Sequence, residues 1–259
     1  MKVKSPFFSI VTGTYNSEKY VGQNMKSVDD QTFNDYEHLI IDGQSTDDTL
    51  SIVDKARKKS SKIKVFSFPP KGISNALNQG INKSSGTYII HLNSDDSFYD
   101  SRVLEKVRAW IEENNFPDVI YGKICTIEDD GKIIGFFPRQ KLLQMANPVL
   151  LKYINFVPHQ AVFIKKSVFD KYGAFDESLT SSMDYDVWLR IIDETRWVFI
   201  NEVISKYRVR KGAQSSDKKN REKNTRNRSL VLHRHLSQLE IIISESINLL
   251  LSKIYKMYR

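Results

Sequence analysis

Residues 87–96 read TYIIHLNSDD and combine two signals that decide the fold. Thr87 to Leu92 is an apolar run rich in β-formers, which predicts a buried strand, and Asn93 to Asp96 is a polar turn at its end. The same order occurs twice upstream, within residues 7–16 and within residues 38–47. We therefore expect three strands that each end in a polar loop.

Strands and helices alternate through the first 122 residues. Further strands are expected at residues 63–68 and 118–121. Segments with apolar residues at helical spacing separate the strands, at residues 17–30, 45–53, 73–82 and 101–113. Ser17 and Ser45 are candidate N-caps for the first two helices. This alternation is typical of a parallel sheet with crossover helices, in which the loops after the strands form the ligand crevice.

The remainder of the chain is less regular. Its expected elements are a hairpin around residues 129–131, a strand ending at Ile164, a helix over residues 183–192, and short strands over residues 197–200 and 203–209. The segment from Lys206 to Arg234 is crowded with Lys and Arg. It is followed from Leu236 to Tyr258 by apolar residues at helical spacing.

Composition limits the possible classes. The chain has 259 residues, 40% hydrophobic and 27% charged, which suits one α/β domain with an appendage. A net charge of +8 suits an anionic partner. The single cysteine, Cys125, leaves no internal disulfide and no thiolate zinc site, and fits a reducing compartment. The start lacks the pattern of a secretory signal, and no apolar run reaches the roughly 18–20 residues of a membrane span. We expect a cytoplasmic location, with peripheral contact to the inner face of the cell membrane as an option.

Aspartates in the polar loops can carry chemistry. Asp95 and Asp96 repel each other unless a cation or hydrogen-bond donors compensate. A hard divalent cation with diphosphate oxygens as further ligands would do so, and a solvated turn is the alternative interpretation. Asp42 can accept from a base N–H or a ribose hydroxyl. We assign Asp47 and Asp48 to the start of the following helix.

A second aspartate pair, Asp184 and Asp186, lies at the start of the helix predicted over residues 183–192. Residues two apart do not share a helix face, so one can face a pocket while the other caps the helix. A carboxylate that faces an acceptor hydroxyl can act as a general base. Helix capping by both aspartates is the alternative.

Together these segments resemble family 2 glycosyltransferases of the GT-A fold. The resemblance covers roughly residues 7–210, in the family's order and at about its spacing. Its motifs are FSIVTGTYN (8–16), DGQSTD (42–47), LNSDD (92–96) and DYDVWLR (184–190). Three more segments resemble a subgroup that builds bacterial surface polysaccharides such as O-antigen and capsule: KGISNALNQG (71–80), PHQ (158–160) and GAFDE (173–177).

The resemblance implies an inverting, metal-dependent transfer of a sugar from a nucleoside-diphosphate sugar, here a UDP-sugar, to an acceptor hydroxyl. It implies Mn²⁺ or Mg²⁺ at Asp96 and a general base at Asp184, and an acceptor that is a glycan or a lipid-linked glycan. The positions it implies for the donor are Thr12, Tyr15 and Asn16 at the nucleotide, Asp42 at the base, Asp95 at the ribose, and Asn75 and Asn78 on the donor-side helix.

The sequence departs from the common pattern at three places. Gly43 stands where many members have a second Asp, and Asn75 stands where the subgroup often has Asp, which leaves the choice of donor open. Arg208, Arg210 and Lys211 occupy a region where many relatives have a His. We assign Arg210 to the diphosphate, because Arg matches phosphate geometry, with a solvated basic edge as the alternative.

The chain divides into a GT-A domain over residues 1–215 and a basic, amphipathic helical extension over residues 216–259. Within the domain, residues 1–122 form the nucleotide-sugar-binding half and residues 123–215 the acceptor-side half. The apolar face of the extension suits an anionic membrane surface or a second subunit in a homodimer. Packing on its own domain is the third option.

Two other classes compete with a transferase. The basic balance would fit a nucleic-acid-binding protein, but the excess charge lies largely in the tail and the crevice loops are acidic, so we expect no nucleic-acid partner. A catalytically silent, transferase-like scaffold is the other class, and the retention of Asp95, Asp96 and Asp184 argues against it. His159 and Gln160 have two interpretations, contact with donor or acceptor and a structural role.

Overall fold

The computed structural model describes residues 5–138, 147–210 and 220–257, with side chains up to residue 250. Within these ranges nine strands form one sheet in the order β3-β2-β1-β4-β8-β6-β9-β5, with β7 beside β6. The strands are β1 Phe8–Thr14, β2 Tyr36–Asp42, β3 Ile63–Ser67, β4 Tyr88–His91, β5 Ser97–Phe98, β6 Val119–Ile127, β7 Ile133–Phe137, β8 Val162–Lys165 and β9 Trp197–Arg208. The helices are α1 Val21–Asp29, α2 Thr49–Arg57, α3 Ile73–Lys83, α4 Val103–Glu113, α6 Lys166–Tyr172, α7 Met183–Ile191, α8 Arg221–His235 and α9 Gln238–Met257, with short 3₁₀ turns η1 Pro148–Lys152 and η2 His159–Ala161.

The first half of the chain builds the predicted parallel sheet. Strands β3, β2, β1 and β4 run parallel in that spatial order. All seven residues of β1 are buried, as expected for a strand with helices on both faces of its sheet. The chain moves outward from β1 to β3 and then returns to place β4 on the other side of β1. This reversal of direction opens a crevice at the carboxyl ends of β1 and β4.

The second half extends the same sheet with mixed directions. β8 lies antiparallel to both β4 and β6, whereas β9 is parallel to β6. The hairpin predicted around residues 129–131 is confirmed: it joins β6 to β7. Gly131 has a φ of +92°, a conformation that glycine adopts without strain. The two strands predicted over residues 197–209 are one strand, β9, whose pairing with β6 shifts register beside Lys123.

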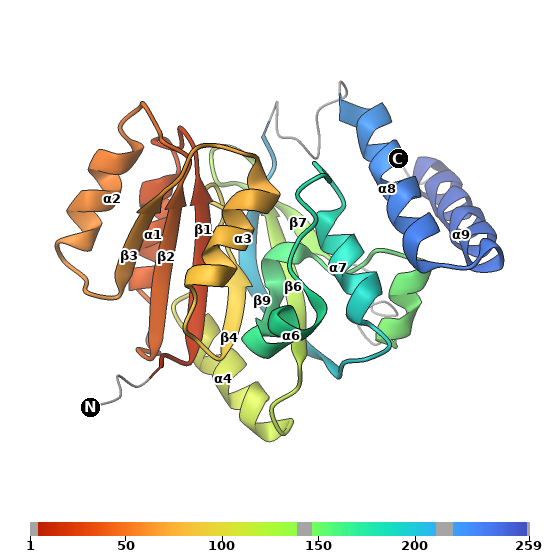
Figure 1. Cartoon of the computed structure of the whole chain (residues 1–259), viewed down its shortest axis with the longest axis horizontal. Coiled ribbons are helices and arrows are strands. Elements are labelled where there is room, and N and C mark those ends of the chain that lie inside the picture. Colours follow the sequence, from red (N-terminus) through yellow and green to blue (C-terminus); the bar gives the residue numbers. More distant parts are fainter. Residues whose placement is uncertain (1–4, 139–146, 211–219, 258–259) are drawn as a thin grey trace.

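Helices cover both faces of the sheet, and each face has its own core (Figure 1). Side chains of β1 alternate between them, with Val11 facing the core under α3 and Ile10 facing the core under α4. Gly80 sets how closely α3 approaches β1, because a Cβ there would lie 2.1 Å from Cγ1 of Val11. Helix α3 can therefore lie at the rim of the crevice.

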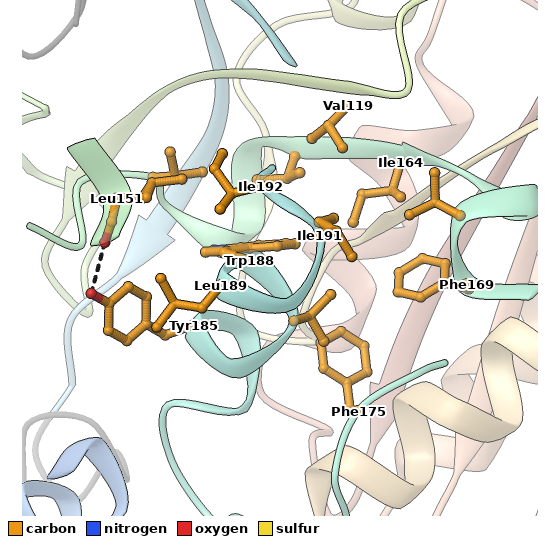
Figure 2. Packing of buried hydrophobic residues seen from close by; sticks show 14 of the residues in the cluster. Val119, Leu151, Ile164, Phe169, Phe175, Tyr185, Trp188, Leu189, Ile191 and Ile192 are labelled. Atoms are coloured by element: carbon orange, nitrogen blue, oxygen red, sulfur yellow. Dashed lines mark hydrogen bonds between the residues drawn. The ribbon is translucent and has the colours of Figure 1, made fainter. Parts of the chain in front are cut away.

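Helix α7 is embedded in the larger core (Figure 2). The Trp188 ring lies among aliphatic side chains and is 1% exposed. The Tyr185 hydroxyl donates a hydrogen bond of 2.7 Å to the carbonyl of Leu151. This packing fixes the axis of α7, so the position of its first turn is fixed as well.

Two helices begin later than the sequence predicts, and one helix was not predicted. Helices α1 and α2 begin at Val21 and Thr49 rather than at Ser17 and Ser45, because both serines bond within the loops. The basic segment before residue 236 contributes a helix of its own, α8. The predicted tail includes residues 211–219, which the structure does not describe, and residues 251–259, whose side chains it does not describe; Lys211, Lys218, Lys219 and Tyr258 are among them. Among the described helices, none has both the length and the hydropathy that crossing a bilayer demands.

Candidate active site

A cleft of about 680 Å³ opens at the carboxyl ends of the parallel strands. Its walls come from the ends of β1 and β2, the loop after β4, the start of α3 and the segment that leads into α7. The lining residues used below are Thr14, Tyr15, Asp42, Gly43, Asn75, Asp95, His159, Thr180, Ser181, Ser182, Asp184, Arg208 and Arg210. The cleft lies where the strand order reverses, which is the usual ligand site of open α/β sheets.

Three aspartates from distant parts of the sequence line this one cleft. Asp42 is the last residue of β2, Asp95 lies in the loop after β4, and Asp184 lies in the first turn of α7. Each of these positions is held by an element with a buried apolar face. The convergence of the three carboxylates therefore follows from the topology of the sheet and from the packing of α7.

The Asp42 carboxylate is held by short hydrogen bonds. Its Oδ1 accepts from the hydroxyls of Thr14 at 3.1 Å and Ser45 at 2.6 Å, and its Oδ2 accepts from the Ser45 backbone N–H at 3.0 Å. Asp42 is fully buried in the cleft wall. Its Oδ2 accepts one hydrogen bond and can accept a second, so a ligand could reach this carboxylate only with a donor aimed at Oδ2.

Tyr15 and Gly43 shape the wall beside Asp42. The Tyr15 side chain is 58% exposed. A Cβ on Gly43 would lie 3.2 Å from Cδ2 of Tyr15 and 3.4 Å from Cβ of Pro70. Gly43 therefore lets the Tyr15 ring and Pro70 close on the strand end, and an aspartate at this position would displace the ring.

Two arginines at the carboxyl end of β9 make different contacts. The Arg208 guanidinium is engaged on every nitrogen, donating to the carbonyls of Asp95 and of residues 128 and 129 and to the Gln23 side chain, with distances of 2.7–3.1 Å. These hydrogen bonds connect the loop after β4 to the β6–β7 hairpin. Arg210 is more exposed, and its Nε donates to Oδ2 of Asp95 at 2.7 Å. Of these two arginines, Arg210 presents its charge to the cleft.

Asp96, the expected metal ligand, does not reach the lining. Its side chain is 2% exposed, and its oxygens accept from the Arg208 backbone N–H and from Nδ2 of Asn93, each at 3.0 Å. Burial, together with the neighbouring charge of Asp95, raises the pKa of Asp96 well above its ordinary value. The structure thus separates the pair: Asp95 lines the cleft, whereas Asp96 lies behind it in the loop.

The two aspartates of α7, Asp184 and Asp186, also differ in whether they line the cleft. Asp184 lies on the cleft wall, and its Oδ1 accepts from the Tyr185 backbone N–H at 2.9 Å. Asp186 is 2% exposed and forms ion pairs with Arg190 and with Nε2 of His235. Burial raises the pKa of Asp186, but the His235 hydrogen bond and the Arg190 charge outweigh it, so the pKa is lowered overall. Asp186 binds α8 to α7 and does not cap the helix.

Two residues of the predicted nucleotide segment lie outside the lining. Thr12 is fully buried, and its hydroxyl lies 3.0 Å from Nε2 of His38. Asn16 is exposed and joins the loops after β1 and β2: its N–H donates to Oγ of Ser45 at 3.0 Å, and its Oδ1 accepts from the Thr46 N–H at 2.9 Å. Asn16 therefore acts on the cleft through the loops that it joins, whereas Thr12 connects β1 to β2.

The two asparagines of α3 that were predicted to serve the donor also differ in whether they line the cleft. Asn75 lines the cleft and donates to Oε2 of Glu177 at 2.9 Å. Asn78 lies outside the lining. It donates to Oε1 of Glu177 at 3.0 Å and accepts from the Phe175 N–H at 2.9 Å, which ties α3 to the segment before α7.

The segment before α7 was not singled out from the sequence. Thr180, Ser181 and Ser182 line the cleft, and Ser182 has a φ of +59°. A positive φ at a serine is uncommon, and it turns the chain so that the first turn of α7 meets the cleft. No local sequence pattern predicts the positive φ of Ser182, because this conformation depends on the packing of α7 and on the contacts of α8.

His159 also lines the cleft, and neither of its ring nitrogens has a hydrogen-bond partner among the described residues. Its ring stacks on His91 with centroids 5.5 Å apart. Burial lowers the pKa of His159, with the Asp184 charge opposing it, so the imidazole is neutral near pH 7. This geometry disfavours the interpretation of a hydrogen-bonded structural histidine.

The residues fit a divalent cation only in company with a diphosphate. In the ranges that the structure describes, no group of three or more His, Cys, Asp or Glu side chains is arranged to hold a metal ion. A hard cation needs only one or two protein carboxylates when phosphate oxygens and waters complete its shell. Asp95 offers such a carboxylate on the cleft wall.

The arrangement can bind an anionic ligand and accept a proton. Arg210 offers a positive charge, Asp42 offers an acceptor for N–H or O–H donors, and Tyr15 offers an exposed ring. Asp184 offers a carboxylate that can take a proton from a hydroxyl.

Known proteins share this architecture. A fragment of TarS from Staphylococcus aureus, residues 1–349, in complex with UDP-GlcNAc superposes with a TM-score of 0.71 and 22% identity, covering 87% of this chain and 65% of that one. A mannosyltransferase from Pyrobaculum calidifontis, in complex with GDP-Man and Mn²⁺, superposes with a TM-score of 0.62 and 15% identity, covering 82% and 59%. This chain spans less than two thirds of either solved chain, and identities this low show the fold alone.

Sequence comparison adds the family. A PGL/p-HBAD biosynthesis glycosyltransferase of Mycobacterium tuberculosis is 27% identical over 206 residues, which are 78% of this chain and 77% of the relative. An uncharacterized glycosyltransferase of Methanocaldococcus jannaschii is 27% identical over 213 residues, 80% of this chain and 72% of the relative. The profile described as glycosyl transferase family 2 matches residues 9–173, more than half of the chain. With a cleft at the carboxyl rim of a GT-A sheet, this chain therefore belongs to glycosyl transferase family 2 and is a glycosyltransferase.

Proposed function

We propose that the chain moves a sugar from a UDP-sugar to an acceptor hydroxyl with inversion at the anomeric carbon. The observation that carries the proposal is that Asp42, Asp95 and Asp184 line one cleft at the switch point of the sheet. In this arrangement Asp42 and Asp95 serve the donor and Asp184 serves the acceptor.

The donor lies between the ends of β1, β2 and β4. Oδ2 of Asp42 accepts a hydrogen bond from the base or the ribose, and the Tyr15 ring packs on the base. Arg210 neutralises charge on the diphosphate, for which its planar guanidinium is suited. Support comes from two neighbours whose structures were solved with UDP-GlcNAc and with GDP-Man.

Asp95 is the residue that would hold a divalent cation, Mn²⁺ or Mg²⁺, together with the donor. The cation would supply Lewis-acid stabilisation of the negative charge on the departing diphosphate. Asp96 keeps the loop in place from behind, held by Arg208 and Asn93. The mannosyltransferase solved with Mn²⁺ supports a cation in this fold.

Asp184 is the general base. Its carboxylate takes the proton of the acceptor hydroxyl as the oxygen attacks the anomeric carbon in line with the leaving diphosphate, which inverts the configuration. The neutral His159 ring lies on the same wall and helps to keep water away from this carboxylate.

The proposal extends to acceptor and location. We assign residues 1–122 to the donor, residues 123–215 to the acceptor, and residues 216–259 to an extension that supports the acceptor side. A glycan or lipid-linked glycan of bacterial surface polysaccharide synthesis, such as O-antigen, is the acceptor class, met at the cytoplasmic face of the cell membrane.

A nucleotide panel tests the donor site. The melting temperature should rise with UDP plus Mn²⁺, rise less with UDP alone, and change least with cytidine or adenosine diphosphates. Incubation with UDP-sugars should then release UDP, and product analysis by NMR should show the inverted anomer. The absence of any shift with every nucleotide diphosphate tested, with and without Mn²⁺, would falsify donor binding at this cleft.

A further inference from the structure

Helix α9 has the reverse of the usual amphipathic arrangement, because its polar face packs on its own domain and its apolar face is exposed. The side that faces its own domain carries polar residues: Ser244 is fully buried and donates to the carbonyl of Tyr153 at 3.0 Å, and Asn248 donates to the same carbonyl at 3.0 Å. Ile241 is the apolar contact on this side. A helix that only packs on its own domain normally turns its apolar stripe inward.

The outward side of α9 is apolar. Large aliphatic residues on it keep 38–67% of their surface exposed: Leu239, Ile242, Ile243, Leu249 and Leu250. Their spacing of three, four, ten and eleven residues from Leu239 places them on one helix face. We call these five residues the α9 stripe. Figure 1 shows α9 at the outer edge of the molecule, beyond α8. The exposed Ser246 lies on the same helix face as the stripe. A largely apolar exposed face of this kind marks an interaction surface.

Charge is strongly segregated toward the same part of the chain. Residues 206–259 contain 14 of the 39 Lys and Arg but only 4 of the 31 Asp and Glu, a formal charge of +10, so residues 1–205 carry −2. Arg221, Lys223 and Arg226 are exposed on α8, the helix paired with α9. Helix α9 itself has balanced charges, with two Glu and two Lys, whereas α8 has five Lys or Arg and one Glu. The apolar stripe therefore lies on a neutral helix paired with a basic one.

We propose that α8 and α9 form a docking surface for an anionic lipid bilayer. The α9 stripe enters the interface, and the basic side chains of α8 bind lipid headgroups of negative charge. The charge decides between the possible occupants: two copies of this chain would bring two segments of like charge together, whereas an anionic bilayer complements them.

The docking surface adjoins the acceptor side of the cleft. The Asn227 side-chain amide on α8 lies 3.1–3.2 Å from the hydroxyls of Ser181 and Thr180, both of which line the cleft. His235 at the end of α8 binds Asp186. A bilayer bound by α8 and α9 would therefore lie near the rim at which the acceptor enters. Lipid binding itself needs no donor and no transfer, so it can fail or succeed independently of the proposed function.

Vesicle sedimentation with the full chain tests the proposal. We expect binding to phosphatidylcholine vesicles containing about one third phosphatidylglycerol, at least about tenfold weaker binding to pure phosphatidylcholine, and weakening in about 0.5 M NaCl. The double substitution Ile242→Gln and Leu249→Gln should weaken binding to the anionic vesicles about tenfold or more. Ile133→Gln is the control for an apolar residue of equal exposure, since Ile133 on β7 is 50% exposed and Ile242 is 52% exposed.

A second set of variants tests the charge. Arg221→Gln with Lys223→Gln and Arg226→Gln should weaken binding about tenfold or more. The control, with the same change in net charge on the exposed lysines of the α2 end, is Lys55→Gln with Lys58→Gln and Lys59→Gln. Unchanged melting temperatures show that the variants fold. Equal binding of control and test variants would overturn the proposal. So would a dimer in sedimentation velocity that the α9 substitutions dissociate, with no binding to anionic vesicles.

Discussion

The loop after β4 and the first turn of α7 each carry two aspartates, and the two regions use them alike. In the loop, Asp95 lines the cleft while Asp96 is buried behind it. In the helix, Asp184 lines the cleft while Asp186 is buried behind it. The regions differ in how the buried member is compensated. Backbone and amide N–H donors hold Asp96, whereas the Arg190 guanidinium and the His235 imidazole hold Asp186.

This difference explains the opposite pKa directions. The pKa of Asp96 rises because burial and the neighbouring Asp95 charge dominate. The pKa of Asp186 falls because its hydrogen bond to His235 and the charge of Arg190 overcome the effect of burial. One buried aspartate therefore favours the neutral form and the other favours the ionised form. Aspartates that are close in the sequence can therefore differ in pKa, because different groups surround them in the fold.

The largest expected effect separates Asp184 from Asp186 by activity. Asp184→Asn removes the proposed base with little change in shape, so kcat should fall about 10³-fold. Folding and donor binding should be unchanged, because the Asp184 side chain is part of the cleft wall and not of the core. Initial rates and nucleotide-induced melting shifts measure these two quantities. Retention of more than about a tenth of wild-type kcat would remove Asp184 from the mechanism.

Asp186→Asn should act on stability instead. The substitution leaves Arg190 and His235 facing a neutral amide in a buried site, and the free energy of unfolding should fall by about 3 kcal/mol. Urea denaturation measures it. Asp193→Asn is the matched control: Asp193 pairs with Lys152 but its side chain is 56% exposed, so the loss should stay below about 1 kcal/mol. Equal losses in both variants would contradict the role of the buried pair.

The pH dependence of the same variant sharpens this comparison. Because the folded-state pKa of Asp186 is lowered, its stabilising contribution is complete above the unfolded pKa near 4 and is lost as the pH falls through the folded pKa. The difference in stability between wild type and Asp186→Asn should therefore shrink as the pH is lowered below about 4. A constant difference across that interval would mean that the ionised carboxylate is not the stabilising species.

The smallest expected effect separates Asp95 from Asp96. Asp95→Asn should weaken the Mn²⁺-dependent part of nucleotide binding about 10–100-fold, because it removes the carboxylate on the cleft wall. Asp96→Asn should lower the melting temperature but leave the Mn²⁺ dependence nearly unchanged. Titrations of UDP with and without Mn²⁺, followed by calorimetry, distinguish the two. If Asp96→Asn alone abolished the Mn²⁺ dependence, the cation would belong to Asp96 after all.

Much of the first half was predictable because its signals are local. Apolar runs with polar ends predict buried strands within residues 7–16, 38–47 and 87–96. In a parallel sheet the carboxyl ends of such strands lie at one edge. Asp42 and Asp95 were reached by this reasoning. The same reasoning did not predict that Thr12 lies outside the cleft lining. Side chains along a strand alternate between faces, and a difference of one residue decides which of them points to the cleft.

The second half was harder because its site depends on distant contacts. The direction of Asp184 follows from Ser182 at positive φ, from the Tyr185–Leu151 hydrogen bond and from the contact of Asn227 with the segment before α7. Leu151 and Asn227, which hold this segment, are both more than 30 residues from Asp184 in the sequence. The basic segment was recognised as a charge run, but its helix α8 and its ion pairs with α7 could not be read from composition.

The sequence by itself determined the alternation of strands and helices, the polar loops at the strand ends, and the excess of positive charge in the tail, because these depend on residue type and on short-range periodicity. The tertiary structure alone decided which aspartate of each pair reaches the cleft, that Arg210 rather than Arg208 presents its charge there, and that α9 turns its apolar stripe outward. The physical reason is that a side chain's direction and protonation depend on the groups that surround it, and these groups come together only when distant segments pack.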